Sequence, residues 1–198
     1  SDMTGSQIHS NKPIAVFAGV KCANIPAQTV ACDHLFTQLP PVEQWVNEYI
    51  VPALTQISGA STLTRILATD DDTHITINGK LVASLQAGQF YQQDVDTDLH
   101  ITSNRPVLVG QFMKGAGATN GKADPSFTYL LGIEQALKSY VFTTPTGQAA
   151  YPVNTLNLVI PNTALPTLKL NGARVDTSTF RTVQNTSYST GYLSIPEG

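Results

Sequence analysis

The clearest pattern in this chain lies between Thr62 and Ala68, where apolar and polar side chains alternate so that successive residues would lie on opposite faces. A period of two predicts a β-strand. Asp70–Asp72 then predicts a turn, and His74–Ile77 a second strand. Asn78-Gly79 follows directly, and this pair predicts a tight hairpin because both residues accept positive φ.

Two short apolar runs, Pro13–Gly19 and Pro106–Phe112, each follow a turn-like Ser-Asn-basic-Pro sequence and predict buried strands. Helical candidates are confined to Val42–Tyr49 and Ala136–Tyr140. Short strands separated by turns at intervals of about 8–12 residues are typical of sandwiches and jelly rolls. The pattern therefore predicts an all-β, β-sandwich or jelly-roll-like fold with only short helical turns.

The chain also repeats itself. Cys32–Trp45 returns in altered form at Asp124–Gln135, displaced by 91 positions. Ile8–Val16 returns as Ile101–Val109, displaced by 93, and Asn171-Gly172 repeats the hairpin pair at that same displacement. Self-similarity at a fixed period indicates an internal duplication.

The duplication predicts two tandem, related β-modules. The first spans residues 1–100 and the second residues 101–198. Each would hold about 90 residues of repeat, a length that can bury a core of its own.

The repeat also changes how we interpret two candidate catalytic residues. Glu43 and Glu134 could form a pair of carboxylates for acid–base chemistry, but each occupies the same position in its own copy, which favours a structural role. The chain contains no Gly-x-Ser-x-Gly motif, and its four histidines, His9, His34, His74 and His100, belong to no recognisable sequence-local arrangement of acid and nucleophile. We therefore expect no enzyme, with a polysaccharide hydrolase as a remote alternative.

Composition narrows the class of protein. Charged residues make up 13% of the chain, about half the usual quarter, and the net charge is −3 with Lys and Arg scattered singly. This distribution offers no patch for nucleic acid. No apolar run reaches the roughly 18 residues of a membrane span. Low charge with abundant Thr and Asn is common in secreted or surface β-proteins.

Two cysteines, Cys22 and Cys32, occur only in the first copy. A zinc site would need two further ligands, and neither a CxxC nor an HExxH motif supplies them. A structural disulfide closing a short loop, worth about 3 kcal/mol in the chain-entropy model, would imply an oxidising compartment. Two unpaired buried thiols are the alternative.

Two further segments were considered as ligand sites, one for calcium and one for phosphate. Asp94, Asp96 and Asp98 resemble the start of a calcium loop, but Leu99 and Arg105 stand where an EF-hand needs Gly and Glu. The choice is between a solvated strand face and calcium bound in another geometry. The Gly-rich stretch Lys114–Ala123 lacks the phosphate-loop pattern and predicts an exposed loop that could belong to a recognition surface.

Several segments together resemble a known family. They are CANIP at 22–26, ACDHLFTQLPPVEQW at 31–45 and DPSFTYLLGIEQ at 124–135, with SNKPIAVFAG and SNRPVLVGQF. These resemble the N-terminal domain family of IgGFc-binding proteins, from Ile8 to about Tyr151. The resemblance implies a secreted, β-rich, non-enzymatic recognition or adhesion module. The family's two cysteines fall on Cys22 and Cys32, which favours the disulfide.

The leading hypothesis is an extracellular or cell-surface adhesion domain that binds a glycan or glycoprotein of another cell. Exposed aromatics beside amides would suit a sugar, and the candidates are Phe90, Tyr91 and Gln92 in one segment and Tyr188 and Tyr192 in another. These residues could equally belong to strand cores. Alternatives are a structural or oligomerisation module of a surface fibre, trimers included, and binding of the immunoglobulin Fc region. No cofactor other than calcium is expected.

Overall fold

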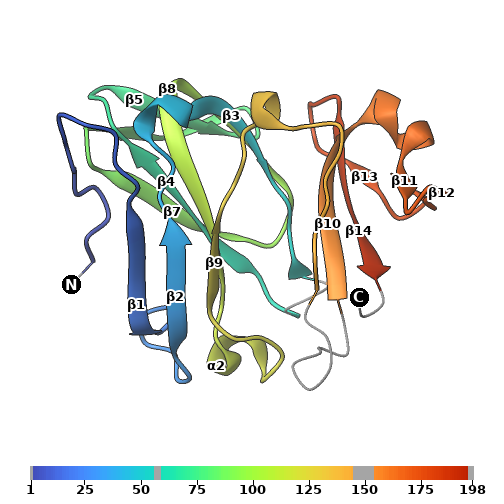
Figure 1. Ribbon diagram of the computed structural model, residues 1–198, viewed down its shortest axis with the longest axis horizontal. Helices are drawn as coiled ribbons and strands as arrows, with labels where there is room; N and C mark the ends of the chain where they lie inside the picture. The colour runs from blue at the N-terminus through green and yellow to red at the C-terminus, as the bar shows by residue number, and fades with distance from the viewer. Residues whose placement is uncertain (1, 56–58, 145–153, 196–198) are drawn as a thin grey trace. The chain divides into compact units, whose positions relative to one another are not determined.

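The computed structural model describes residues 2–55, 59–144 and 154–195 (Figure 1). Strands dominate, and the helical elements are short. In chain order the elements are β1 (Phe17–Ala23), β2 (Asp33–Gln38), η1 (Val42–Gln44), β3 (Val46–Val51), β4 (Thr62–Ala68), β5 (Thr73–Ile77), β6 (Lys80–Leu85), β7 (Phe90–Val95), β8 (Leu99–Met113), α2 (Ala116–Thr119), β9 (Ser126–Tyr129), η2 (Ile133–Gln135), β10 (Asn154–Pro161), η4 (Asn162–Thr167), β11 (Lys169–Leu170), β12 (Ala173–Arg174), β13 (Arg181–Thr182) and β14 (Tyr188–Ile195). The mostly-β prediction is confirmed.

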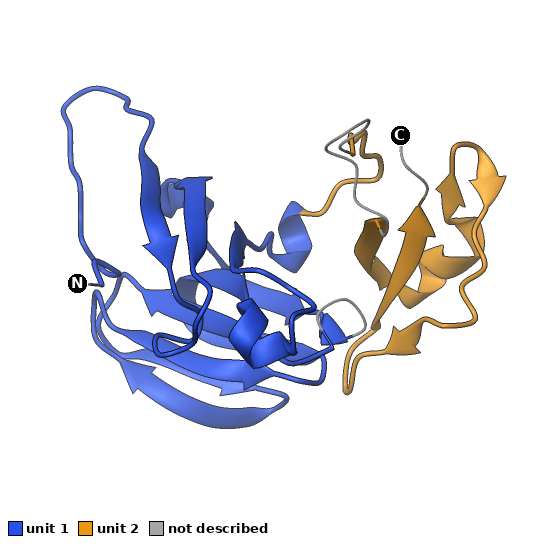
Figure 2. Cartoon of the chain, turned by 90° about the horizontal axis from the view of Figure 1, so that it is seen from below, with its two compact units in different colours: residues 1–135 blue, residues 136–198 orange. Residues whose placement is uncertain are grey.

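Contacts divide the chain into two compact units, residues 1–135 and 136–198 (Figure 2). A boundary after residue 100 was expected from the repeat. That point lies inside β8, which continues without a break from Leu99 to Met113 and pairs with strands from both sides of it. The hydrogen bonds of this strand therefore hold residues 101–135 in the first unit.

Unit 1 is organised around β8. Its first half pairs with β3 and β5, and its second half pairs with β4 and β9, always antiparallel. With β7 beside β4 and β6 beside β5, these strands form a seven-stranded sheet that curls into a half-barrel (Figure 1). Pro106 lies between the residues of β8 that pair with β5 and those that pair with β4, and its lack of an N–H suits a point where the partner strands exchange.

The core lies inside this curl. Aliphatic side chains from six strands pack there, and the members with essentially no exposed surface include Val51, Ile66, Ile75, Ile101 and Val109. β-Branched residues predominate because they fit a pleated, buried surface. The predicted strand over Thr62–Ala68, the strand near His74–Ile77 and the hairpin at Asn78-Gly79 are all confirmed.

The expected helix over Val42–Tyr49 was wrong. Only Val42–Gln44 forms a 3-10 turn, and the chain then enters β3. Tyr49 and Val51 pair with Ile101 and Leu99 of β8. The local spacing favours a helix, but pairing with a strand about 50 residues away in the sequence stabilises β3 instead. Ala136–Tyr140 likewise forms no helix.

Unit 2 is smaller. Its largest element is the β10–β14 hairpin-like pair, extended by β13, with a separate two-residue ladder between β11 and β12. Asn171-Gly172 forms the predicted tight turn, with φ of 51° and 81°. The fold as a whole does not show two equal modules, because the seven-stranded sheet of unit 1 has no counterpart of that size among the described residues of unit 2.

Cys22 and Cys32 form a disulfide, as predicted. It closes the loop between β1 and β2. This loop packs against the segment after β8, where the Gly115 N–H donates to the Ile25 carbonyl at 2.8 Å. Within the described parts of the chain, no helix is both long and apolar enough to cross a membrane.

Tyr49 secures β8 against β3. Its hydroxyl donates to the Val107 carbonyl at 2.7 Å and accepts the Val46 N–H at 3.3 Å. Burial raises the pKa of Tyr49, the charge of Glu134 raises it further, and only the Val46 N–H opposes the shift. The neutral phenol is therefore the form that the fold stabilises.

Replacing Tyr49 with Phe leaves the Val107 carbonyl without this donor, so we expect the free energy of unfolding to fall by about 1–3 kcal/mol. The raised pKa also means that the contribution of Tyr49 is complete below the ordinary tyrosine pKa and is lost as the pH rises through the folded-state value. Urea unfolding at pH 7 and above pH 10 checks both points. Tyr192→Phe, at a partly exposed site, is the control. Equal losses in the two variants would contradict the assigned role of Tyr49.

Removing the disulfide in the Cys22→Ser/Cys32→Ser double variant should cost about 3 kcal/mol, since the bond closes a short loop and restricts the unfolded chain. Thermal unfolding of the oxidised wild type, the reduced wild type and the double variant measures this cost. We expect the reduced protein to match the variant. A reduced protein as stable as the oxidised one would contradict the prediction.

Candidate functional site

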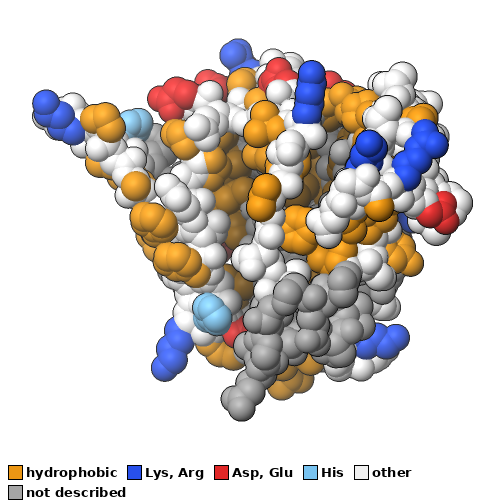
Figure 3. Space-filling model, turned by 45° about the vertical axis from the view of Figure 1, so that its right-hand side comes forward, with side chains coloured by type: hydrophobic (Ala, Val, Ile, Leu, Met, Phe, Trp, Pro, Cys, Tyr) orange, Lys and Arg blue, Asp and Glu red, His pale blue; other side chains and the backbone are white. Residues whose placement is uncertain are grey.

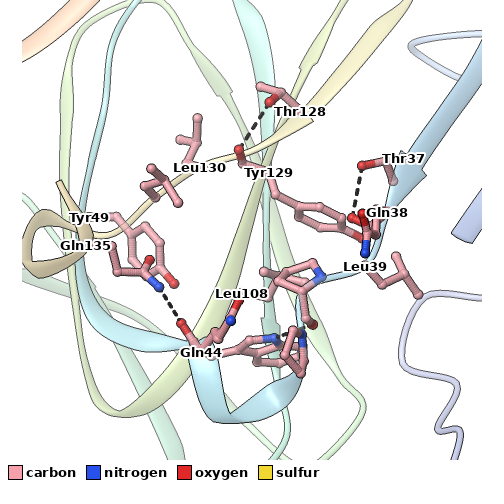
Figure 4. A pocket seen from close by; sticks show the side chains of 14 residues that line it. Thr37, Gln38, Leu39, Gln44, Tyr49, Leu108, Thr128, Tyr129, Leu130 and Gln135 are labelled. Carbon is pink, nitrogen blue, oxygen red and sulfur yellow. Dashed lines mark hydrogen bonds between the residues drawn. The ribbon is translucent and has the colours of Figure 1, made fainter. Parts of the chain in front are cut away.

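A cleft in unit 1 lies between two similar stretches of chain. One runs from β2 through Pro40-Pro41 to η1, and the other runs from β9 to η2 (Figure 4). The cleft has a volume of about 470 Å³, which is within the range of small-molecule sites. Its lining comprises Thr37, Gln38, Leu39, Pro40, Pro41, Gln44, Trp45, Tyr49, Leu108, Thr128, Tyr129, Leu130, Leu131 and Gln135.

The repeat explains why these two stretches form matching walls. Thr37 and Thr128 are separated by 91 positions, as are Gln44 and Gln135, so repeat-related residues line both sides. β2 also lies against β9. The two walls are joined directly, because the Gln135 Nε2 donates to the Gln44 carbonyl at 2.7 Å (Figure 4).

Gln135 is held on its other side as well. Its Oε1 accepts the Gly132 N–H at 2.8 Å. Gly132 has to be glycine here, since a Cβ would collide with a Val46 methyl and lie 2.9 Å from the Glu48 carbonyl oxygen. The turn at η2 thus approaches β3 closely enough to bring Gln135 across to η1.

Hydroxyl groups edge the cleft. Thr37 donates to the Gln38 carbonyl at 3.3 Å, and Thr128 donates to the Tyr129 carbonyl at 3.1 Å (Figure 4). Each hydroxyl oxygen also has acceptor capacity for a ligand. Gln38 is exposed and brings an amide, which both donates and accepts.

Two partly buried aromatic rings line the same space. The Trp45 indole N–H donates to the Pro40 carbonyl at 3.3 Å, which fixes the ring against the Pro-Pro segment. Tyr129 packs edge-on against Phe127, with ring centroids 4.7 Å apart. Burial raises the pKa of Tyr129, with the positive charge of Arg65 acting in the opposite direction, so its phenol is neutral near pH 7. Aromatic faces beside amides and hydroxyls can stack on and hydrogen-bond a polar, ring-shaped ligand.

Phe90, Tyr91 and Gln92 lie on β7, outside this cleft. The Arg65 guanidinium lies 4.2 Å from the Phe90 ring centre and donates to the Gln92 Oε1 at 2.8 and 3.0 Å. Tyr91 packs against the core, and its hydroxyl donates to Gln93. The polar and aromatic groups of this segment thus contact other side chains of the protein. Its role in ligand binding stays a prediction.

Tyr188 and Tyr192 lie on β14 of unit 2, opposite Pro161 and Asn157 of β10. The structure therefore does not place them in the sheet that carries Phe90 and Gln92. Their role in ligand binding also stays a prediction.

Two of the three aspartates considered as possible calcium ligands contact other groups of the chain. Asp94 forms an ion pair with Lys114 at 2.9 Å, and Asp98 accepts the Ala53 N–H at 2.8 Å. Asp96 is exposed in the turn after β7. No group of three or more His, Cys, Asp or Glu side chains suited to a metal ion occurs in the described parts of the chain.

Sequence reasoning missed the cleft. The repeated Thr and Gln residues are visible in the sequence, but the repeat alone does not show that the two stretches lie side by side. The signal that could have revealed the cleft was the presence of two similar strand-to-turn stretches, each ending in Glu-Gln, that could pack side by side. Gln135 does serve the fold, whereas Gln38 and Tyr129 present polar or aromatic groups to the cleft.

These features define a disulfide-bonded β-sheet protein with a cleft suited to binding. Comparison with known sequences identifies its family: the chain belongs to the IgGFc binding protein family, whose model matches residues 1–197. It is 29% identical, over 145 residues, to the human (Homo sapiens) IgGFc-binding protein. That match covers 71% of this chain and 3% of the human protein. No solved structure matches.

The bridge made by Gln135 can be tested with its repeat-related counterpart as control. Gln135→Ala removes one hydrogen bond to each of two backbone groups, so we expect a loss of about 1–3 kcal/mol in unfolding free energy. Gln44→Ala changes an exposed side chain but keeps the carbonyl, and should cost within about 0.5 kcal/mol. Urea unfolding of both variants is the measurement. If Gln44→Ala proved the more damaging, the bridge would not be what joins the walls.

Proposed function

We propose that this chain is an extracellular, non-catalytic recognition module whose cleft binds a carbohydrate carried by a surface glycoprotein. The observation that supports this proposal most strongly is the lining of the cleft. It combines two aromatic rings, an amide and two hydroxyls, from Trp45, Tyr129, Gln38, Thr37 and Thr128. Sugars offer apolar ring faces and many hydroxyls, and this set of groups complements both.

Family membership supports a binding module. The name of the human relative says that it binds IgG Fc, and the chain matches only a small share of that protein. The disulfide between Cys22 and Cys32 supports an extracellular location, since such bonds persist in oxidising compartments.

A second candidate is recognition of the Fc polypeptide itself, which the name of the relative favours. The two candidates differ in what the cleft contacts. A carbohydrate ligand would be lost when sugar is removed from a glycoprotein, whereas a polypeptide epitope would remain.

The test is binding of the purified chain to a glycan array that also carries IgG Fc and Fc stripped enzymatically of its N-glycans. We expect a defined set of sugars to bind, and any Fc binding to disappear on deglycosylation. Repeating the array with a chelator tests Asp94, Asp96 and Asp98 as calcium ligands. Equal binding to intact and stripped Fc would favour the second candidate, and silence on every spot would overturn both.

Single substitutions can test whether the ligand binds in the cleft. Gln38→Ala and Tyr129→Phe each remove a polar group at the cleft, and we expect each to weaken binding about 3- to 15-fold, the equivalent of one net hydrogen bond. Gln92→Ala is the matched control, because it removes an amide of the same kind from β7, outside the cleft. Loss of binding in Gln92→Ala alone would move the site to β7.

A further inference from the structure

The cleft of unit 1 has an uncharged lining. Hydroxyls, amides, aromatic rings and aliphatic groups make up its surface, and no Asp, Glu, Lys, Arg or His is among the described residues that line it (Figure 4). Leu39, Leu108 and Leu130 supply part of the apolar surface. A carboxylate or sulfate that moves from water into such surroundings loses hydration, and no cation of the lining compensates for the loss. The lining therefore favours an uncharged ligand.

Each wall of the cleft carries one carboxylate beside this lining. Glu43 precedes Gln44 in η1, and Glu134 precedes Gln135 in η2. The two carboxylates occupy the same repeat position, 91 residues apart, and both are exposed. Neither forms an ion pair with any residue that the structure describes. Two negative charges thus lie next to the glutamines that join the walls.

The charge of Glu134 reaches the cleft. Tyr49 is a lining residue, and its pKa is raised by burial and further by the charge of Glu134. An acidic group on a ligand in the same space would be repelled by the same charge. Two like charges about 8 Å apart in water weaken binding roughly twofold, and more where protein of lower dielectric constant lies between them.

One basic residue acts on the cleft, and it already has a carboxylate partner. Burial raises the pKa of Tyr129 and the Arg65 charge opposes this shift. Arg65 lies opposite Gly110 and Gly110 opposite Tyr129, so the three residues share one face of the sheet. The Arg65 guanidinium pairs with the Asp2 carboxylate at 2.8 Å and also donates to Gln92. Its charge is therefore balanced within the protein.

The protein as a whole carries few charges that could mask the two carboxylates. Asp, Glu, Lys and Arg make up 13% of the chain. Uncharged side chains, many of them hydrophobic, cover most of the surface seen in Figure 3. The field of an isolated carboxylate on such a surface is screened mainly by the ions of the solvent.

We propose that the cleft selects neutral sugars and rejects acidic ones, and that Glu43 and Glu134 are the charges that discriminate. The inference rests on the proposed function, because it takes the ligand of the cleft to be a carbohydrate. The ligand class is sugars whose substituents are hydroxyls and acetamides, without carboxylate, sulfate or phosphate. Selectivity of this kind comes from repulsion of the wrong ligand as much as from contacts to the right one.

Glycans that differ in charge but little in shape test the selection. The panel contains neutral glycans, the same glycans with a hexose replaced by its uronic acid, and the carboxamides of those acids. It also contains sialylated glycans with their carboxamides. We expect the neutral glycans and the carboxamides to bind at least about tenfold more tightly than the matching acids at low salt.

Salt separates repulsion from exclusion by size. Raising the salt from about 0.01 M to 1 M shortens the Debye length from about 30 Å to 3 Å, so the preference for neutral glycans should narrow about two- to fivefold. A preference set by size would not respond. Acids bound as tightly as neutral glycans would overturn the inference and leave the proposed function standing. No glycan bound, or binding unaffected by Gln38→Ala and Tyr129→Phe, would overturn both.

Substitutions at the two carboxylates test which charges discriminate. Glu43→Gln and Glu134→Gln should each raise the affinity for an acid, relative to its carboxamide, about two- to fivefold. Asp96→Asn removes the same charge from the turn after β7 and should leave this ratio unchanged. That turn follows Val95, which pairs with one end of β4, whereas Leu108 of the cleft pairs near the other end. Equal effects of the three substitutions would overturn the assignment.

A positive charge in the lining gives the reverse test. Gln38→Lys exchanges an exposed amide of the cleft for a cation, and we expect the ratio of acid to carboxamide affinity to rise at least about tenfold. Gln28→Lys places the same charge in the exposed disulfide loop, at the far end of β2, as the matched control. We expect it to change the ratio less than about twofold. Equal gains in the two variants, or no gain in either, would overturn the proposal.

Discussion

Unit 1 depends on one strand that is hydrogen-bonded along both edges. β8 takes β3 and β5 along its first half and β4 and β9 along its second, and the aliphatic core closes around it. Unpaired backbone groups in such a core would be costly, so β8 cannot be removed without opening both sides of the curl. The Tyr49 hydroxyl adds a side-chain bond to the same strand at Val107. The compact unit therefore extends past the middle of the sequence repeat, to Gln135.

Unit 2 presents the opposite case. Among the described residues β10 pairs with β14, and the apolar run at Tyr140–Phe142 is exposed although its counterpart in unit 1 lies in the core. A similar local sequence is thus a buried strand in unit 1, where it pairs with β8, and an exposed segment in unit 2.

The cleft arises from a different consequence of the repeat. Two strand-to-turn stretches pack against each other, and the bond from Gln135 to the Gln44 carbonyl joins them. Residues that hold this joint are committed to the fold, while Gln38, Trp45 and Tyr129 contribute surface to the space between the walls. Membership of the IgGFc binding protein family agrees with a role in recognition. Tyr129 lies on β9, and the Trp45 indole is held by its hydrogen bond to the Pro40 carbonyl. Rings that are already fixed lower the conformational cost of binding a ligand.

The sequence by itself determined the β-rich class and the turns at Asn78-Gly79 and Asn171-Gly172, because these depend on local alternation and on positive φ. It left the state of Cys22 and Cys32 open until the family resemblance favoured the disulfide that the structure contains. The helix expected over Val42–Tyr49 was wrong, because pairing with β8 overrides the helical spacing. The expected division after residue 100 falls within β8, whose pairing keeps residues 101–135 in the first compact unit. Only the tertiary structure decided which repeated residues were buried, which lined the cleft and which were left exposed. Those outcomes depend on partners tens of residues away, and identical local patterns cannot encode whether such a partner is present.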